Sequence, residues 1–492
     1  TYDMMKKMKL TRRLTPLAVT ASTTPILPDT PVSGPVARSL PVISPPRQLL
    51  DSAPCLITPP DTPTYNYQSV IFPDDSRVML WTSCKQTSQY SCGLNGLFAQ
   101  YYHADGTKQG EPVRLIAPSD QENSGCASSV GDRPAISYSA RACGDNQLTL
   151  TWETLVPCQK GLLMQVYDSH GTPIDEPQNS PIESATYNTH SLTLSDGRYV
   201  LAWETMNYSA ASNILMFQHY DANNTKQHDP IPLSNHVNVW EENLAWVALN
   251  DGGWVGVWDS GYSYSGHKDG QDGYLSGVFA QRYSATGEKA GDTVQINQYT
   301  AHRQENPCLI QLHDNTIVIA WQSEHQDQSD FGIFARQFDA MMVPLGDEFQ
   351  VNTYAYSNQH SPRIVAVPTG FVIGWTSQDS TVNGVYAQAY ELDGTPLGTE
   401  YRINADTETT LLELAPLATG GYTAVVATGV EQTEICDFRF DRFNNPIQAG
   451  DSVGQSTTPR PTLSPVTSPY DFTLSPNSDQ ILSQPSLAYL PT

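Results

Sequence analysis

The chain has 492 residues, only 16% of them charged, and a formal net charge of −25. A charge of this sign and size repels phosphate backbones and anionic lipid surfaces, so we do not expect nucleic acid as a partner. No run of 18 apolar residues occurs, and we therefore expect no transmembrane segment.

Residues 1–63 are predicted to form a Pro-rich N-terminal arm. Within it, the segment from Met4 to Ala21 places lysines and arginines ahead of a short apolar stretch, which is the charge order of an export signal; a basic solvated arm is the alternative. Residues 452–492 form a similar Pro-rich C-terminal arm. Such segments are extended and build no core alone, so the arms are either linkers or strands that add to a neighbouring copy.

Between the arms, residues 64–451 carry a repeat in which a tryptophan closes an apolar run. The tryptophans are Trp81, Trp152, Trp203, Trp258, Trp321 and Trp375, and a weaker seventh copy lies at Tyr422–Gly429. A second apolar run that begins at glycine follows several of them, as in Gly332–Phe338. Each unit contains about four short strands in roughly 50 to 60 residues, which is the period of a propeller blade.

The repeat predicts an all-β fold, a seven-bladed β-propeller. The run Ile317–Trp321 is apolar on both faces, as expected for a sheet covered by a neighbour on each side. We therefore assign the repeated tryptophans to the core. A strand from Gln48–Thr58 added to the last blade would close the ring; an open solenoid or an array of separate domains is the alternative.

Eight cysteines in an acidic, Tyr-rich chain fit an oxidising compartment, so we expect a secreted, extracellular or cell-surface protein. The predicted disulfides are Cys84 with Cys92, Cys143 with Cys158, and Cys55 with Cys436, the last of which would lock the ring. Asn207 and Asn223 begin glycosylation sequons.

Residues 237–405 resemble the repeats of large secreted bacterial surface proteins of the RTX and adhesin-associated type. The resemblance lies in Asn306-Pro, Trp321-Gln-Ser, Gly332–Phe338 and the run from Pro344 to Thr353. It implies an extracellular binding or scaffolding role, and calcium as a candidate ligand. The tandem glycine-rich nonapeptide that forms the calcium roll of RTX proteins is absent from this sequence.

Acidic residues directly follow three of the blade tryptophans, namely Glu153, Glu204 and Asp259. A glycosidase needs two carboxylates at one site. Because these three occupy equivalent positions in different blades, we interpret them as variation within the repeat and assign no catalytic residue. No G-x-S-x-G, H-E-x-x-H or Walker motif occurs.

The longest insertion after a tryptophan run mixes aromatic and acidic residues. Its candidate binding residues are Tyr262, Tyr264, Asp269, Asp272 and Tyr274, with Asp269 and Asp272 also as candidate calcium ligands. Trp240 is a second candidate for an exposed contact; a solvated, turn-rich loop is the alternative interpretation of the insertion.

The sequence-based interpretation is thus a non-enzymatic extracellular structural or adhesive protein. Its propeller is expected to form a homo-oligomer or filament through the terminal arms. The alternatives are a lectin-like propeller that binds calcium or a surface glycan through residues 261–274, and a polysaccharide-degrading enzyme.

Overall fold

A computed structural model describes the blades and most of the turns between their strands. The described residues are 55–57, 64–72, 74, 76–88, 91–104, 107–116, 138–143, 146–153, 162–179, 187–207, 212–221, 225–234, 240–261, 275–355, 357–378, 383–404, 409–417, 419–428 and 434–447. All of them belong to one compact unit, residues 44–492. In this part of the chain the regular elements are all β-strands, and no helix is long and apolar enough to span a membrane. Both arms, apart from residues 55–57, lie outside the described residues.

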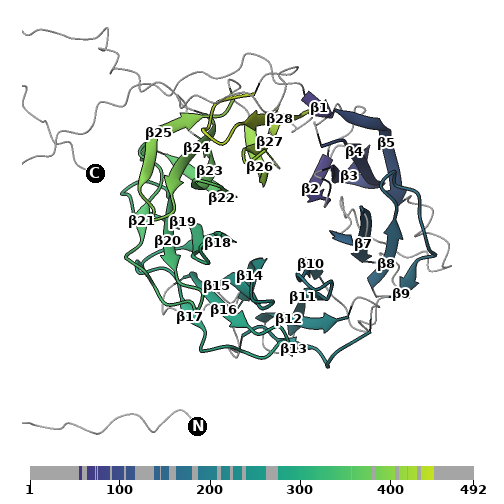
Figure 1. The fold of residues 1–492 in the computed structure, drawn as a ribbon, viewed down its shortest axis with the longest axis horizontal. Coiled ribbons are helices and arrows are strands. Elements are labelled where there is room, and N and C mark those ends of the chain that lie inside the picture. The colour runs from purple at the N-terminus through teal and green to yellow at the C-terminus, as the bar shows by residue number, and fades with distance from the viewer. Residues whose placement is uncertain are drawn as a thin grey trace, which may run out of the picture. The chain divides into compact units, whose positions relative to one another are not determined.

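The strands form a ring of seven blades around a central axis (Figure 1). The strands that run nearest the axis are β2 (Thr64–Ile71), β6 (Tyr138–Cys143), β10 (Tyr187–Thr193), β14 (Trp240–Ala248), β18 (Gln304–Gln311), β22 (Asn358–Val367) and β26 (Thr409–Pro416). The second strands are β3 (Arg77–Ser88), β7 (Gln147–Glu153), β11 (Tyr199–Asn207), β15 (Trp254–Gly261), β19 (Ile317–Glu324), β23 (Gly370–Gln378) and β27 (Tyr422–Thr428). The third strands are β4 (Ser91–Tyr102), β8 (Leu162–Tyr167), β12 (Ser212–Tyr220), β16 (Gly277–Tyr283), β20 (Phe331–Phe338), β24 (Gly384–Glu391) and β28 (Glu434–Phe440). The outermost strands are β5 (Lys108–Ile116), β9 (Gln178–Asn179), β13 (Ile231–Pro232), β17 (Val294–Gln295), β21 (Phe349–Gln350), β25 (Pro396–Arg402) and β1 (Cys55–Ile57).

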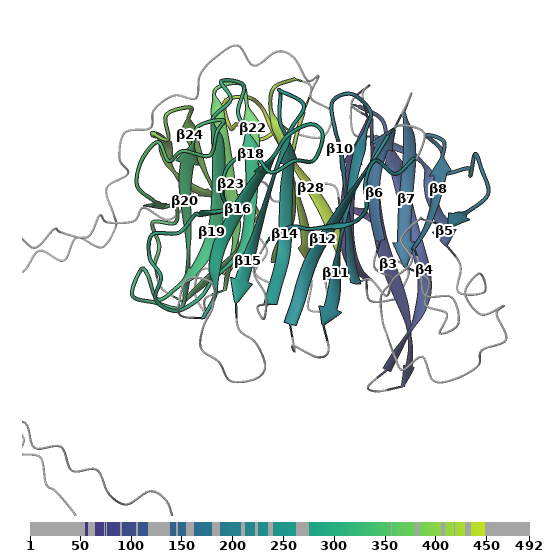
Figure 2. The ribbon, with the colours of Figure 1, turned by 90° about the horizontal axis from the view of Figure 1, so that it is seen from below.

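The second strands form the core between blades, and in six of the seven blades they carry the repeated tryptophan. In β19, every residue from Ile317 to Ser323 is buried, which confirms a sheet covered on both faces. The six tryptophans of the repeat are between 0% and 4% exposed, so their assignment to the core is confirmed. Viewed from the side, these strands run along the height of the ring (Figure 2).

Small residues in the second strands allow adjacent blades to approach closely. At Gly374 in β23, an added Cβ would lie 2.9 Å from Cδ2 of Leu411 in β26, the inner strand of the next blade. A larger residue here would push the two sheets apart, because interiors have no spare volume.

The seventh blade closes the ring with a strand from the start of the chain. β1 pairs antiparallel with β28, in the segment for which a closing strand was predicted. The ladder places Cys55 opposite Cys436, and Cys436 is disulfide-bonded. The seventh blade also contacts the first, because the buried guanidinium of Arg77 in β3 pairs with the carboxylate of Asp437 in β28.

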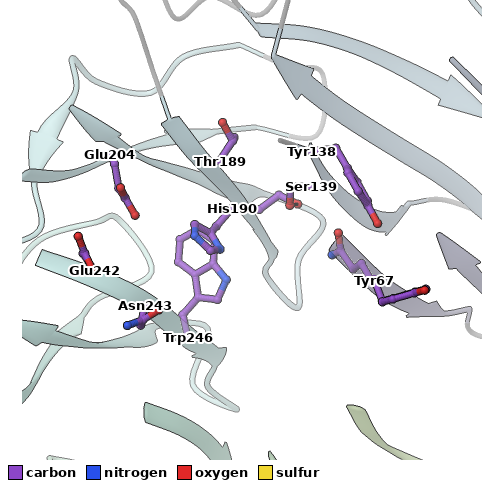
Figure 3. A pocket seen from close by; sticks show the side chains of 11 residues that line it. Tyr67, Tyr138, Ser139, Thr189, His190, Glu204, Glu242, Asn243 and Trp246 are labelled. Atoms are coloured by element: carbon purple, nitrogen blue, oxygen red, sulfur yellow. Dashed lines mark hydrogen bonds between the residues drawn. The ribbon is translucent and has the colours of Figure 1, made fainter. Parts of the chain in front are cut away.

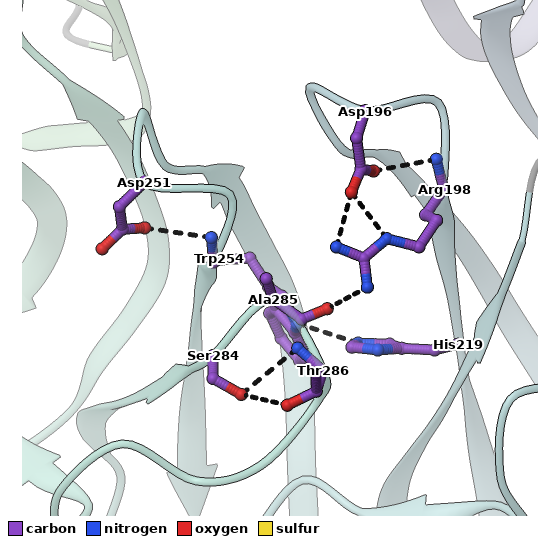
Figure 4. Close-up of polar contacts among 9 residues, drawn as sticks. Asp196, Arg198, His219, Asp251, Trp254, Ser284, Ala285 and Thr286 are labelled. Atoms are coloured by element: carbon purple, nitrogen blue, oxygen red, sulfur yellow. Dashed lines mark hydrogen bonds and ion pairs between the residues drawn. The ribbon is translucent and has the colours of Figure 1, made fainter.

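Blades three and four are connected by a backbone bridge as well as by side chains. A parallel bridge between Asn213 in β12 and Trp240 in β14 merges their sheets. Arg198 donates from Nη1 to the carbonyl of Ala285 at 2.6 Å, and Trp254 donates from Nε1 to Nε2 of His219 at 3.0 Å (Figure 4). These contacts fix the relative position of the two blades that contribute most to the cavity described next.

Candidate active site

A cavity of about 580 Å³ lies against the inner strands of the first four blades. Its lining residues are Tyr67 and Gln68 from β2, Tyr138 and Ser139 from β6, Thr189, His190 and Ser191 from β10, Glu204 from β11, and Glu242, Asn243 and Trp246 from β14 (Figure 3). The cavity therefore exists only after the ring has brought four separate repeats together.

β-Bulges in the inner strands help to present these side chains. The ladders shift register between Tyr65 and Gln68, between Tyr187 and His190, and between Glu242 and Ala245. Asn243 occupies the left-handed region with φ of 51°, which asparagine tolerates better than most residues. A bulge breaks the strict alternation of a strand, so consecutive residues such as Glu242 and Asn243 can both reach the cavity.

Hydrogen bonds between inner strands hold one wall of the cavity. The side-chain amide of Gln68 donates to the carbonyl of Ala140 at 2.8 Å and accepts from its N–H at 3.0 Å. The hydroxyls of Ser139 and Ser191 share a hydrogen bond of 2.7 Å. Blades one, two and three are thus tied together by side chains where no backbone ladder joins them.

Two carboxylates from neighbouring blades lie at one end of the cavity. Glu204 is buried and accepts a hydrogen bond of 2.6 Å from Nδ2 of Asn213. Glu242 is exposed to the cavity, and partial desolvation by the walls raises the pKa of its carboxyl group. In Figure 3 both carboxylates lie at the same end of the cavity, beside Asn243.

Aromatic rings line the rest of the cavity. His190 and Trp246 meet edge to face, with ring centroids 6.3 Å apart and an interplanar angle of 85°. Burial lowers the pKa of His190 to about 4, so its imidazole is neutral at pH 7. Tyr67 and Tyr138 lie at the opposite end from the two glutamates, and burial keeps Tyr138 a neutral phenol by raising its pKa.

This arrangement combines groups that serve acid–base chemistry on a sugar. Two carboxylates with different surroundings can divide the roles of acid and base, and flat aromatic faces pack against the apolar faces of pyranose or furanose rings. Among the described lining residues none is lysine or arginine. Within the described part of the chain, no group of three or more His, Cys, Asp or Glu residues could hold a metal ion.

Most of the binding residues predicted from sequence lie outside the described residues, namely Tyr262, Tyr264, Asp269, Asp272 and Tyr274. The loop that contains them leaves β15 at Gly261, which lies opposite Trp240 in the ladder. Trp240 begins β14, and Glu242 of the cavity follows two residues later. Of the sequons, Asn207 ends β11 opposite Ser212, and Asn223 is outside the described residues.

The three acids that follow blade tryptophans lie in different surroundings. Glu153 ends β7 opposite Leu162. Glu204 lines the cavity, a position that its interpretation as variation within the repeat did not include. Asp259 is buried and accepts hydrogen bonds from Nδ2 of Asn243 and from the backbone N–H of Asn306.

The cysteines correct one predicted disulfide. Cys143 is a free thiol whose sulfur accepts a hydrogen bond from Thr149, so its predicted pairing with Cys158, which lies outside the described residues, is not formed. Cys143 ends β6 opposite Gln147 in a tight hairpin, and its side chain is engaged within that hairpin. In the β3–β4 ladder, Cys84 lies opposite Leu94 and Cys92 opposite Gln86.

Sequence reasoning missed most of the cavity. Tyr67, Tyr138, His190, Trp246 and Glu242 were not selected as candidate residues. A signal was available at the start of two inner strands, where a polar pair precedes the apolar run: Glu242-Asn243 and Glu305-Asn306. These pairs mark the bulges that face the axis.

Comparisons with known proteins identify the fold but no family. No family model matches the chain, and no curated protein matches its sequence. A solved polysaccharide lyase, the PL25 ulvan lyase, aligns with a TM-score of 0.50 and 9% identity over 78% of this chain and 94% of its own. An α-L-arabinanase of Penicillium chrysogenum aligns with a TM-score of 0.42 and 15% identity over 62% of this chain and 93% of its own. An α-L-arabinofuranosidase of Fusarium graminearum aligns with a TM-score of 0.40 and 11% identity over 62% of this chain and 92% of its own.

These findings correct the main sequence-based interpretation. We expected a non-enzymatic structural or adhesive protein. The solved structure that shares this fold at a TM-score of 0.50 is a polysaccharide lyase, which contradicts that expectation and favours the alternative of a polysaccharide-degrading enzyme. The error has a physical origin. The tryptophan repeat reflects packing between blades and carries no information about the residues that line the cavity.

Proposed function

We propose that this protein is a polysaccharide-degrading enzyme that hydrolyses glycosidic bonds in the cavity at its axis. The observation that carries the proposal is the presence of Glu204 and Glu242, from neighbouring blades, in one cavity whose other walls are aromatic and polar. A solved polysaccharide lyase with the same fold supports the degradation of a polysaccharide but not the hydrolytic route.

The two carboxylates take different roles. Glu242 is the acid, because desolvation favours its protonated form and its side chain is open to the cavity. It gives its proton to the oxygen of the leaving sugar as the glycosidic bond breaks. Glu204, oriented by Asn213, acts on the sugar carbon either through a water molecule or directly, and the anomeric configuration of the product distinguishes the two routes.

The aromatic residues position the sugar. Trp246 and His190 offer a flat and an edge-on ring within the cavity, so a sugar ring can stack there while its hydroxyls reach Glu204, Asn243 and Ser191. His190 is neutral at pH 7 and adds no positive charge to the wall.

The charge of the cavity favours hydrolysis of neutral glycans over lyase chemistry. A cation that neutralises the sugar carboxylate would assist elimination from a uronate, and no described lining residue is a lysine or arginine. Two glutamates in the cavity and a net charge of −25 on the chain would repel a polyuronate.

The test is a screen of the purified protein on neutral polysaccharides (arabinan, xylan and mixed-linkage glucan) and on anionic ones (ulvan, pectate and alginate). Hydrolysis releases new reducing ends, whereas a lyase also produces the ultraviolet absorbance of an unsaturated uronate. We expect reducing ends without that absorbance on a neutral substrate. We expect Glu204→Gln and Glu242→Gln to lower kcat/KM by about a hundredfold or more.

Glu305→Gln is the matched control for these variants. Glu305 occupies in β18 the ladder position that Glu242 occupies in β14, but it does not line the cavity, so this variant should keep activity within a few-fold of wild type. Polysaccharide binding without new reducing ends would leave a carbohydrate-binding propeller and defeat the hydrolase proposal. Unsaturated products would defeat it in favour of a lyase.

A further inference from the structure

The side-chain amide of Asn243 is held in one orientation by a buried neighbour. Asn243 follows Glu242 at the bulge of β14 and is exposed in the wall of the cavity, where Figure 3 shows it with Glu242 and Trp246. Its Nδ2 donates a hydrogen bond of 2.8 Å to Oδ2 of Asp259 in β15, a residue that is only 5% exposed. This bond occupies the donor end of the amide and leaves its carbonyl oxygen, Oδ1, as the open end.

Asp259 is itself anchored by the next blade. The same oxygen, Oδ2, accepts a hydrogen bond of 2.9 Å from the backbone N–H of Asn306 in β18. A backbone N–H can only donate, so this contact keeps Oδ2 as an acceptor, and an NH2 group is the partner that such an acceptor takes from Asn243. Among the described residues, Oδ1 of Asn243 has no hydrogen-bond partner, so it presents an acceptor to whatever occupies the cavity.

The bond from Asn243 is an addition to a contact that recurs around the ring. Gln322 in β19 and Thr376 in β23 occupy the position of Asp259 and also accept a backbone N–H from near the start of the next inner strand. Within the described part of the chain, neither of them binds a side chain of the inner strand of its own blade. Joining the blades therefore does not require the bond to Asn243, and the effect of that bond is on the cavity wall.

We propose that Asn243 is a specificity-determining residue that accepts a hydrogen bond from a free hydroxyl of the sugar in the cavity, and that Asp259 is the residue that positions it. The inference rests on the proposed function in taking a neutral glycan as the ligand. An unsubstituted hydroxyl supplies the proton that Oδ1 needs, whereas a uronate or sulfate oxygen has no proton to give and would face a second acceptor. The site therefore selects sugars that are unsubstituted at the position beside Asn243.

The contact can be measured by binding alone. The probes are arabinotriose, xylotriose and cellotriose, followed, for the one that binds best, by derivatives in which one hydroxyl at a time is replaced by fluorine, which is similar in size but cannot donate. Calorimetry in the Glu204→Gln background gives Kd without hydrolysis. We expect fluorine at one position to weaken binding about threefold to tenfold. In Asn243→Gly this loss should disappear, and glycine adopts the left-handed φ of 51° at this position without strain.

Matched variants separate this effect from a general change in structure. Asn306→Gly is the same substitution at the bulge of the next blade, where φ is 53° and the residue does not line the cavity, so it should keep the loss caused by fluorine. Asp259→Asn retains an acceptor oxygen for Asn243 and should keep the loss, whereas Asp259→Leu should reduce it to less than about twofold. Gln322→Leu removes the equivalent acceptor of the next blade and should keep the loss.

The outcomes distinguish failure of this inference from failure of the proposed function. Absence of binding by all three trisaccharides, no loss with fluorine at any position, or the same loss in Asn243→Gly as in the Glu204→Gln background alone overturns the role of Asn243. The same loss in Asp259→Leu overturns the positioning role of Asp259. If the loss depends on Asn243 while the wild type hydrolyses no polysaccharide, the inference stands and only the enzyme assignment falls.

Discussion

The seam between the seventh and first blades depends on a buried ion pair whose removal should weaken the whole ring. Arg77 and Asp437 are 360 residues apart in the chain, and their side chains are 6% and 1% exposed. Asp437 also accepts hydrogen bonds from Thr423 and, at 3.2 Å, from Nε of Arg439. Asp437→Asn keeps the shape of the side chain but leaves the guanidinium of Arg77 buried without its counter-charge.

The expected cost follows from burial. Removing one partner of a buried pair typically costs about 3–5 kcal/mol, because the remaining charge stays desolvated. A matched control exists in the fourth blade, where Arg282 pairs with Asp251, whose side chain is 54% exposed. Asp251→Asn is the same substitution at an ion pair that water reaches, and we expect it to cost about 0–1 kcal/mol.

The assay is urea-induced unfolding of both variants and the wild type, followed by tryptophan fluorescence. Since the core tryptophans lie in the second strands of six blades, their fluorescence reports on the ring as a whole. We expect a clearly lower midpoint for Asp437→Asn than for Asp251→Asn. Equal midpoints for the two variants would refute the argument that the closing ion pair matters because it is buried.

Three further stability changes follow from the structure. Folding raises the pKa of Asp259 from the ordinary 3.8 to about 8, so between about pH 4 and pH 8 the folded chain holds a proton that the unfolded chain has lost. The stability of the fold therefore falls as pH rises through this window. In thermal unfolding measured across pH, the stability gain of Asp259→Asn over wild type should be largest above pH 8. Trp321→Ala, at a side chain that is fully buried, should cost about 3–5 kcal/mol in urea unfolding, whereas Met341→Ala, at 60% exposure, should change the same measurement by less than about 0.5 kcal/mol. Cys436→Ser should lower the melting temperature and reduce the effect of reductant on it, since the disulfide of Cys436 restrains the closing blade. An equal effect of reductant on both proteins would contradict this.

The sequence alone was enough to predict the ring, because the features that build a blade are local. Each repeat contains the same local features: an apolar run that typically ends in tryptophan, a glycine that often starts the next strand, and a polar turn. The burial of Trp258 and Trp321 and the seven blades agree with that pattern. The closing strand could also be predicted. A closed ring needs a strand from the start of the chain to join the last blade, and Cys55 and Cys436 lie in these two segments.

The cavity was decided by the tertiary structure. Tyr67, Tyr138, His190 and Glu242 lie in four different repeats, so no local pattern indicates that they face one another. Bulges at the start of the inner strands also break the alternation from which the facing side of a residue would be inferred. The sequence by itself determined the blades, because their packing depends on periodic apolar side chains. Only closure of the ring determined the candidate active site, because it sets which polar residues of distant repeats come to share the axis.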